Sequence, residues 1–430
     1  MKRLLLIGAG HAHARVLRDW VDSPVPGVEL VLVSPAALAP YSGMVPGWLA
    51  GRYAYPDICI DFQALAAAAG ACWMQDEIAS LDGGRRSVTL VSGAVLAFDL
   101  LSLNIGSTLT PPAHAAAGPG RSVGASAPML SLRPLGRLHM AWDQQLAAIA
   151  AQPSDAPFTV IAVGGGAAGF ECLLAVLARL RALQPGRPLH GGLVSRAGSL
   201  LPGLAPGAVR AAGRALAQAG VQLQLGTDWR EALHGRSGPG HGPGDEPANA
   251  LAFGLASPPN SPARLPIGPA SLPISPQDGL VLWATGAEAH AWQRCPARRG
   301  GLAVSEAGFI RVDRHLRSVS HPAVYAVGDC AEWAPPLPKA GVFAVRMGPV
   351  LSRNLRAALG QGVAGDYQPQ RRFLALLATG DGRAIGAWGG WSAQGRWLWR
   401  WKDRIDRQFL RGFVVQTSNR TPCASGSAPE

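Results

Sequence analysis

Close to its start the chain reads Leu4-Leu-Leu-Ile-Gly-Ala-Gly-His-Ala-His13, in which a short apolar run leads directly into the pattern Gly8-x-Gly10. Apolar residues then recur at helical spacing from Val16 to Val21. This order predicts a buried strand, a tight glycine turn and the start of a helix. Such a turn lets the backbone approach a diphosphate, which the N–H groups and positive dipole end of the helix favour. His13 stands where the usual fingerprint has a third glycine, so an ordinary strand–turn–helix is the alternative.

A second copy of this pattern is complete and reads Gly164-x-Gly166-x-x-Gly169. It follows a predicted strand at 158–163 and precedes a predicted helix at 172–183, which is the context that dinucleotide binding requires. We therefore expect two dinucleotide-binding units.

Both units lack the acidic residue that usually binds a ribose about 20 residues after the glycines. Ser34 takes this place in the first unit, and Ser195 and Arg196 take it in the second. An arginine there can accommodate a 2′-phosphate, which would favour NADPH. The alternative is that Arg196 is one more surface arginine in an arginine-rich chain.

The composition predicts two or three domains with large cores, because 430 residues of which 48% are hydrophobic exceed one small domain. The net charge of +12 is compatible with plain solubility, with an anionic membrane surface or with nucleic acid. Basic residues are interleaved with aromatic residues only near the C-terminus, so we expect no nucleic-acid partner. No run reaches the ~20 apolar residues of a membrane span, and the first apolar run is too short for a secretion signal. We expect a cytoplasmic protein.

The six cysteines predict reduced, scattered thiols. They form neither C-x2-C nor C-x4-C pairs, so we expect no metal site and no disulfide framework. Their positions are 59, 72, 172, 295, 330 and 423.

Further strands are predicted by short apolar runs, and a Gly/Pro/Ser/Ala-rich stretch at 235–277 predicts a surface insertion. The strands are expected at 28–33, 72–75, 87–91, 95–98, 98–103, 191–195, 221–225, 280–284, 309–312 and 323–327, and additional helices at 61–69 and 138–151.

The two glycine patterns, together with Ala284-Thr-Gly286 and Tyr325-Ala-Val-Gly-Asp329, resemble the pyridine nucleotide-disulfide oxidoreductase superfamily. The resemblance covers residues 1–355 and implies an α/β fold with two Rossmann-like domains of the three-layer ββα type. FAD would bind the first domain, and NAD(P)H would bind a second domain inserted into the first. The implied boundaries are 1–132 and 291–355 for the FAD domain, 133–290 for the NAD(P) domain, and 356–430 for a small C-terminal segment.

A closer resemblance rests on four stretches, namely His11-Ala-His13, residues 40–47 (PYSGMVPG), 338–348 (PKAGVFAVRMG) and 399–406 (WRWKDRID). They are similar to the flavoprotein family found fused to the N-terminus of selenophosphate synthetase (selenide, water dikinase). The likeness extends to residue 412, and only a short Ser/Pro/Ala tail follows where the synthetase domain would stand. Type II NADH:quinone dehydrogenases and sulfide:quinone reductases are wider kin.

The resemblance assigns functional residues to this chain. Asp329 would hold the ribityl chain near the diphosphate, and Glu171 would lie near the nicotinamide. The alternatives are that Asp329 caps a helix and that Glu171 favours a helix N-terminus. Glu171 and Lys339 are the candidate catalytic residues, and no metal ligands are expected. The expected cofactor-binding residues are Gly8, Gly10, His11, His13, Ser34, Tyr41, Gly164, Gly166, Gly169, Glu171, Arg196, Thr285, Gly286, Gly328, Asp329, Lys339 and Phe343.

The implied chemistry is electron transfer from NAD(P)H through FAD to a diffusible, quinone-like acceptor. Disulfide reductases carry a C-x4-C pair in the region of 41–46, and this chain has none there. Lys339 and Arg346 could stabilise a reduced flavin or be surface charges, His11 and His13 could be structural, and Cys330 could carry sulfur or only pack. Two other functions stay open: a soluble flavoenzyme that reduces selenium or sulfur compounds, and a non-catalytic flavin-binding docking module.

The segment 396–413 predicts an amphipathic helix. Trp397, Trp401, Ile405 and Phe409 recur every fourth residue, beside an adjacent stripe of arginines at 400, 404, 407 and 411. Such a helix can lie in the interface of a bilayer, at the cytoplasmic face of the membrane. It can equally dock on its own domain or on a partner, and a homodimer is left open.

Overall fold

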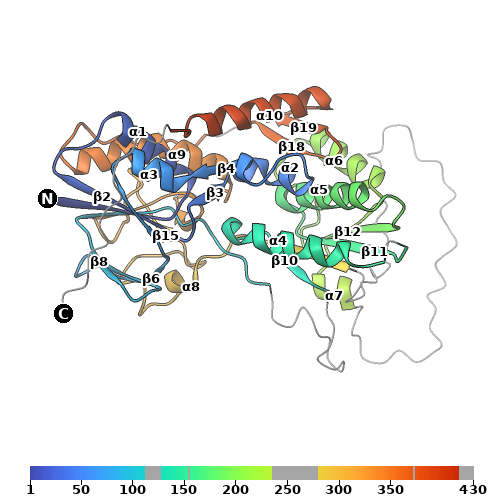
Figure 1. Ribbon diagram of the computed structural model, residues 1–430, viewed down its shortest axis with the longest axis horizontal. Coiled ribbons are helices and arrows are strands. Elements are labelled where there is room, and N and C mark those ends of the chain that lie inside the picture. The colour runs from blue at the N-terminus through green and yellow to red at the C-terminus, as the bar shows by residue number, and fades with distance from the viewer. Residues whose placement is uncertain (112–126, 154, 235–278, 371–372, 416–430) are drawn as a thin grey trace.

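The computed structural model describes residues 1–111, 127–153, 155–234, 279–370 and 373–415. Within these ranges the chain forms two five-stranded parallel sheets with helices packed on them and a small antiparallel sheet near the C-terminal end (Figure 1). This architecture confirms the predicted α/β class with two Rossmann-like units.

The first sheet has the strand order β16-β9-β1-β2-β5, and every neighbouring pair is parallel. Its strands are β1 (Lys2–Ile7), β2 (Val28–Ser34), β5 (Cys72–Gln75), β9 (Leu100–Leu103) and β16 (Val324–Ala326). The edge strand β16 comes from a part of the chain more than 200 residues after β9, so two distant segments build one sheet, as the resemblance implies.

The two faces of this sheet are covered differently, which gives three layers. Because side chains alternate along a strand, Leu4 and Leu6 of β1 pack towards helices, and Leu5 and Ile7 pack towards a β meander. The helices are α1 (His11–Asp22), α3 (Phe62–Ala68) and α9 (Gly341–Ala358), and the meander is β6 (Ile78–Asp82), β7 (Ser87–Leu90) and β8 (Val95–Ala97).

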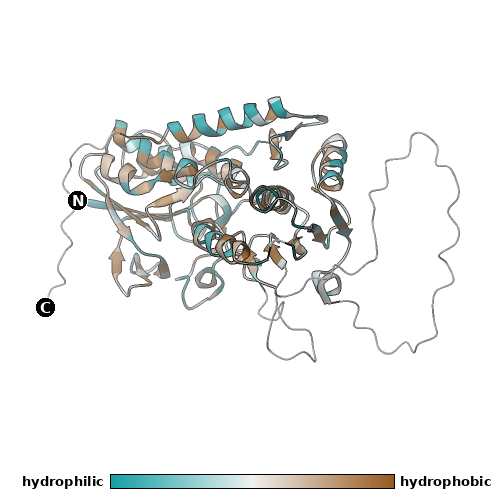
Figure 2. Ribbon diagram, turned by 45° about the vertical axis from the view of Figure 1, so that its right-hand side comes forward, coloured by the Kyte–Doolittle hydropathy of each residue, from teal (hydrophilic) through white to brown (hydrophobic). Residues whose placement is uncertain are grey.

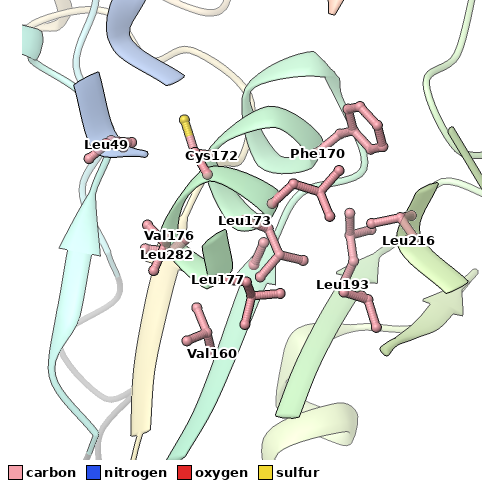
Figure 3. Close-up of a cluster of buried hydrophobic side chains, with 14 of the residues drawn as sticks. Leu49, Val160, Phe170, Cys172, Leu173, Val176, Leu177, Leu193, Leu216 and Leu282 are labelled. Carbon is pink, nitrogen blue, oxygen red and sulfur yellow. The ribbon is translucent and has the colours of Figure 1, made fainter. Parts of the chain in front are cut away.

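The second sheet has the order β10-β14-β11-β12-β13 and is again parallel. Its strands are β10 (Met129–Ser131), β11 (Phe158–Val163), β12 (Leu189–Ser195), β13 (Val221–Leu225) and β14 (Gly279–Trp283). The predicted boundary between the two units lies at residue 132, but the three residues of β10 just before it already pair within the second sheet. The largest hydrophobic core surrounds α5 (Ala167–Leu183), where Leu173 and Leu177 pack between the sheet strands and neighbouring helices (Figure 3).

The remaining elements before the C-terminal segment lie within or between these two units. They are β3 (Leu38–Pro40), η1 (Ser42–Met44), α2 (Val45–Leu49), η2 (Pro56–Ile58), β4 (Cys59–Asp61), α4 (Leu135–Ala150), α6 (Pro206–Gln218), α7 (Trp229–His234), α8 (Ala291–Arg294), β15 (Ile310–Arg311), η3 (Gly328–Cys330) and β17 (Ala331–Glu332). The predicted strands and helices within the described residues are confirmed with end shifts, while the insertion predicted at 235–277 and Cys423 lie outside the described residues.

The C-terminal segment contains an antiparallel sheet that the sequence analysis did not predict. Its strands β18 (Ala375–Ala378), β19 (Ala384–Trp388) and β20 (Trp391–Gly395) lead into helix α10 (Arg396–Arg411). Helix α10 lies along one side of the molecule from the region of α1 to that of α6, so it spans both units (Figure 1). Among the described residues, no helix has the length and apolar character needed to cross a bilayer.

Candidate functional site

The first glycine turn is held closed by Asn104 at the end of β9. Gly8 has a φ of +100°, and a Cβ there would lie 2.5 Å from the Asn104 carbonyl oxygen. The Asn104 side chain accepts hydrogen bonds from the N–H groups of Ala12 (3.0 Å) and His13 (3.3 Å) and donates to the Val327 carbonyl (3.0 Å). Asn104 therefore joins the N-terminus of α1 to the far end of β16. Asn104 is not among the residues predicted from the sequence, although a polar residue at the end of a buried strand is a recognisable signal.

His13 is buried and hydrogen-bonded through both ring nitrogens. It is fully buried, with Nδ1 2.8 Å from the Gly8 carbonyl oxygen and Nε2 2.8 Å from the Ser102 hydroxyl. Because a carbonyl only accepts, Nδ1 carries the proton and Nε2 accepts from Ser102 in the neutral ring. Burial lowers the pKa of His13 to about 4, with the Gly8 hydrogen bond opposing the shift. Both ring nitrogens of His13 thus have partners within the protein.

The Ser34 hydroxyl likewise forms its hydrogen bonds with other residues of the protein. Its hydroxyl donates to the Ala36 carbonyl (2.8 Å) and accepts from the indole N–H of Trp73 (3.0 Å), and the residue is fully buried. A ribose could reach this hydroxyl only after Trp73 moved away.

Four of the predicted residues from the chain's second half line one small pocket. Gly328, Asp329, Lys339 and Phe343 line it together with Met347, although they come from η3, a loop and α9. The ammonium of Lys339 donates to the Ala331 carbonyl (2.5 Å) and lies 3.8 Å from the centre of the Phe309 ring. Burial lowers the pKa of Lys339, with nearby acidic groups opposing the shift. Arg346, by contrast, is exposed on α9.

Arg133 and Ser107 complete the surroundings of Asp329. The Asp329 carboxylate forms an ion pair with Arg133 and accepts a hydrogen bond from the Ser107 hydroxyl (3.2 Å). Arg133 also donates to the Lys339 carbonyl (3.4 Å). Asp329 and Arg133 lie almost 200 positions apart along the chain, and no local pattern marks Arg133, so sequence reasoning missed it.

His11 is placed between this pocket and the C-terminal helix. Burial lowers its pKa to about 4, and the charge of Asp329 acts in the opposite direction. Its ring centre lies 5.3 Å from that of Tyr41 and 6.0 Å from that of Phe409. Tyr41 and Phe409 are in turn 4.6 Å apart, so the two predicted residues His11 and Tyr41 belong to one aromatic cluster.

The second glycine turn is tight on one side and open on the other. Gly164 has a φ of +129°, and a Cβ there would collide with the Ala284 carbonyl oxygen, as one at Gly169 would collide with that of Gly164. A Cβ at Gly166 or Gly286 would meet nothing within 4 Å. The N-terminus of α5 therefore faces open space where a diphosphate fits. Thr285 follows Ala284 at this edge, and Arg196 is exposed just after β12.

Glu171 faces the C-terminal sheet. Its Oε1 accepts a hydrogen bond from the Ala378 N–H of β18 at 2.7 Å. Burial raises the pKa of Glu171 to about 7, with the charge of Lys402 opposing the shift and that of Asp406 adding to it. The carboxyl group therefore belongs to a cluster of ionisable groups that includes α10.

Cys59, Cys172, Cys295 and Cys330 are free thiols. Cys330 is fully buried, donates to the Val327 carbonyl (3.2 Å), and has its pKa raised to about 11 by burial. These features fit a packing residue rather than a reactive thiol. Among the described residues, no group of His, Cys, Asp and Glu side chains could hold a metal ion.

Helix α10 packs with a polar side inward. Leu398, Lys402 and Asp406 are buried, whereas Trp397 (53%), Trp401 (41%) and Ile405 (38%) are exposed. The ends of β19 and β20 add the exposed Trp388 and Trp391, and the arginines at 396, 400, 404 and 411 are exposed on α10. Figure 2 shows α10 as largely hydrophilic along its length. The apolar stripe of Trp397, Trp401 and Ile405 does not dock on the helix's own domain, whereas Phe409 does contact Tyr41.

The comparisons with known proteins support the fold. A family model described as pyridine nucleotide-disulphide oxidoreductase matches residues 277–348. The sulfide:quinone oxidoreductase of Aquifex aeolicus is similar in structure over 96% of this chain and 91% of its own, with a TM-score of 0.68 and 13% identity. No curated protein matches the sequence.

Two further solved structures have the same arrangement. Putidaredoxin reductase, in its covalent complex with putidaredoxin, matches 90% of this chain and 81% of its own with a TM-score of 0.61 and 18% identity. The water-forming NADH oxidase of Lactobacillus brevis matches 90% and 75% with a TM-score of 0.59 and 17% identity. At these identities the similarity shows a shared fold.

Proposed function

We propose that this chain is an FAD-dependent NAD(P)H dehydrogenase that passes electrons to a diffusible, quinone-like acceptor. The observation that carries the proposal is the pairing of two glycine turns on separate parallel sheets with a pocket lined by Gly328, Asp329, Lys339 and Phe343. When bound, FAD would accept a hydride from the nicotinamide and deliver two electrons onward.

The residues present fit these two cofactors. Gly8 and the first turn of α1 would face the FAD diphosphate, although Asn104 already takes two of the N–H groups. Asp329 would exchange its bond to Arg133 for one to the ribityl chain. The Lys339 ammonium would stabilise negative charge on the reduced ring system. The open space before α5 at Gly166 would take the NAD(P)H diphosphate, and Arg196 would face the 2′ position of the adenosine ribose.

The acceptor is proposed from what surrounds the flavin site. The region 41–46 has no cysteine, and the buried Cys330 hydrogen-bonds to carbonyl groups. Electrons would therefore leave for a small molecule rather than for an internal disulfide. The Aquifex aeolicus neighbour is named a sulfide:quinone oxidoreductase, which supports a quinone as the acceptor. A persulfide reductase is also similar in structure, so a sulfur compound is the alternative acceptor. A link to selenium metabolism rests on the sequence resemblance alone.

Peripheral contact with an anionic membrane is part of the proposal. The exposed residues Trp388, Trp391, Trp397, Trp401 and Ile405, together with the neighbouring arginines, combine an apolar stripe with positive charge. Tryptophan and arginine suit the boundary between headgroups and acyl chains. A quinone dissolved in the bilayer would then be close to the protein that reduces it, at the cytoplasmic face.

The test is anaerobic titration of the purified full-length protein. We expect a bound flavin whose long-wavelength absorbance bleaches on addition of NADH or NADPH and returns on addition of a soluble quinone faster than with oxygen. Absence of bleaching with both nucleotides would contradict the dehydrogenase and favour a non-catalytic flavin-binding module. Reoxidation by polysulfide or selenium compounds, but not by quinone, would favour the alternative acceptor.

A further inference from the structure

A buried lysine of the C-terminal helix holds a loop of the first unit. The loop consists of Tyr41 and η1 (Ser42–Met44), and we call it the 41–44 loop. Lys402 Nζ donates to the Gly43 carbonyl oxygen at 2.5 Å and lies 2.7 Å from Asp406 Oδ2. The side chains of Lys402 and Asp406 are only 7% and 8% exposed. Helix α10 is therefore joined to the loop by a buried, charge-assisted hydrogen bond.

The 41–44 loop is tightly folded around Gly43. A Cβ at Gly43 would lie 2.8 Å from Cε1 of the Tyr41 ring. The Met44 N–H donates to the Tyr41 carbonyl at 2.9 Å, and the Tyr41 N–H donates to the Ile58 carbonyl at 2.7 Å. The Tyr41 ring also packs on α10, with its centre 4.6 Å from that of Phe409. A movement of the Gly43 carbonyl would therefore displace the loop as a whole.

On its other side the loop contacts the N-termini of α1 and α9. The Tyr41 ring lies edge-on to His11, the first residue of α1, with ring centres 5.3 Å apart. A Cβ at Gly341, the first residue of α9, would lie 2.6 Å from Ser42 Oγ. Helix α1 follows the first glycine turn, and Phe343 of α9 lines the pocket around Asp329. The loop thus adjoins both parts of the proposed FAD site.

Stability alone does not account for the pair of Lys402 and Asp406. Replacement of a buried ion pair by apolar side chains of similar volume is often neutral or stabilising. An apolar side chain, however, cannot donate to the Gly43 carbonyl. The feature that the charged pair provides, and an apolar pair would not, is a fixed position of the 41–44 loop relative to α10.

We propose that Lys402 is a positioning residue for FAD, which holds the 41–44 loop against α1 and α9. The inference rests on the FAD site of the proposed function. Lys402 acts through the loop: while it binds the Gly43 carbonyl, Tyr41 and Ser42 stay beside the two helix N-termini. The site is then preorganised. Without this hydrogen bond the loop would have to be ordered when FAD binds, and ordering a loop lowers affinity.

The first test measures the loop itself by hydrogen–deuterium exchange of the full-length protein, with no nucleotide or acceptor added. In Lys402→Met we expect exchange in 41–44 to become at least roughly tenfold faster, because the loop opens locally. Leu398→Ala is the matched control. Leu398 is also fully buried on α10 but packs on β19, where a Cβ at Gly386 would lie 3.0 Å from Leu398 Cδ2. Its exchange should rise in 384–388 rather than in 41–44. Unchanged exchange of 41–44 in Lys402→Met, or an equal rise in both variants, would overturn the inference.

The second test measures the affinity for FAD from its release on dilution, followed by flavin fluorescence. We expect the dissociation constant to rise roughly tenfold in Lys402→Met and by less than roughly twofold in Leu398→Ala. The double variant Lys402→Met/Asp406→Asn separates position from stability. It leaves no unpaired buried carboxylate, so it should regain stability, but it still lacks the donor to Gly43 and should keep the weak affinity.

The outcomes of the second test are distinct. Wild-type affinity in Lys402→Met, or affinity that returns with stability in the double variant, would overturn the positioning role. A wild type that binds no FAD would instead contradict the proposed function, and with it the role of Lys402 towards FAD. The exchange test requires no FAD, so it separates these two failures.

Discussion

Lys402 Nζ lies 2.7 Å from Asp406 Oδ2, one turn further along α10, and both side chains are almost completely buried. We expect Lys402→Met to lower the free energy of unfolding by about 3–5 kcal/mol, because it leaves a buried carboxylate without its cation. Denaturant unfolding of the full chain measures this loss. The matched control is Arg18→Met, which removes an exposed pair with Asp22 of the same spacing and should cost less than about 1 kcal/mol. Similar losses in both variants would contradict the importance of burial.

A second prediction concerns the glycine turn before α5. We expect Gly164→Ala to abolish NAD(P)H binding, because its φ of +129° and the Ala284 carbonyl leave no room for a Cβ. Titration of bound-flavin absorbance with either nucleotide measures the effect. Gly136→Ala on α4 is the control, since its Cβ would meet no atom within 4 Å. Wild-type bleaching in Gly164→Ala would show that the nucleotide binds elsewhere.

A third prediction concerns pH. The pKa of His13 is about 4 in the fold against 6.5 for a free histidine, so the unfolded chain binds more protons between these values. Stability is therefore complete above pH 6.5 and falls as the pH drops towards 4, by up to about 3 kcal/mol for this residue. Glu171 has a raised pKa and acts in the opposite direction over part of this range, so the slope of the wild type alone does not isolate His13.

A His13 variant isolates the contribution of this residue to the pH dependence of stability. We expect His13→Gln to be less stable at neutral pH, because it disturbs the bonds to Gly8 and Ser102, and to lose less stability on acidification than the wild type. The exposed His190→Gln serves as the control and should retain the wild-type dependence. Denaturant unfolding at several pH values measures all three proteins. An unaltered pH dependence in His13→Gln would mean that another group carries it.

A fourth prediction concerns the exposed tryptophans of α10. We expect replacement of Trp397 and Trp401 by serine to reduce co-sedimentation with phosphatidylglycerol vesicles, because these rings supply the apolar contact. Arg400→Gln and Arg404→Gln should weaken binding to anionic vesicles by about 1 kcal/mol for each charge removed and leave binding to neutral vesicles unchanged. Val319→Ser, an exposed apolar residue away from α10, is the control. If the wild type does not bind either vesicle, α10 serves another partner.

The features that the sequence predicts well are those with local causes. Both strand–glycine–helix units are confirmed as elements because an apolar run, a glycine turn and helical spacing all lie within about 20 residues. The two-part first sheet was expected only from the resemblance, since nothing local indicates that β16 pairs with β9. The small strands β18 and β19 escaped prediction because their alanine, leucine and glycine residues have weak strand preference.

The functional surroundings depend on contacts that no local pattern encodes. Arg133 forms an ion pair with Asp329 from a distant part of the chain. The His13 ring of α1 hydrogen-bonds to the Ser102 hydroxyl of β9. Helix α10 is the clearest case. Its apolar stripe suggests an inward face, but the Gly43 carbonyl offers Lys402 a partner, and the ion pair with Lys402 allows Asp406 to be buried as well.

The late position of β16 has a consequence for synthesis. The second sheet is complete once β14 has been made, at Trp283, whereas the first sheet lacks its edge strand until Val324–Ala326 emerges. Asn104 and Arg133 also cannot form their contacts, with Val327 and Asp329 respectively, until those later residues have been made. Because domains fold as the ribosome releases them, the inserted unit should mature first. The N-terminal unit, although translated earlier, would remain the part most exposed to proteases and chaperones.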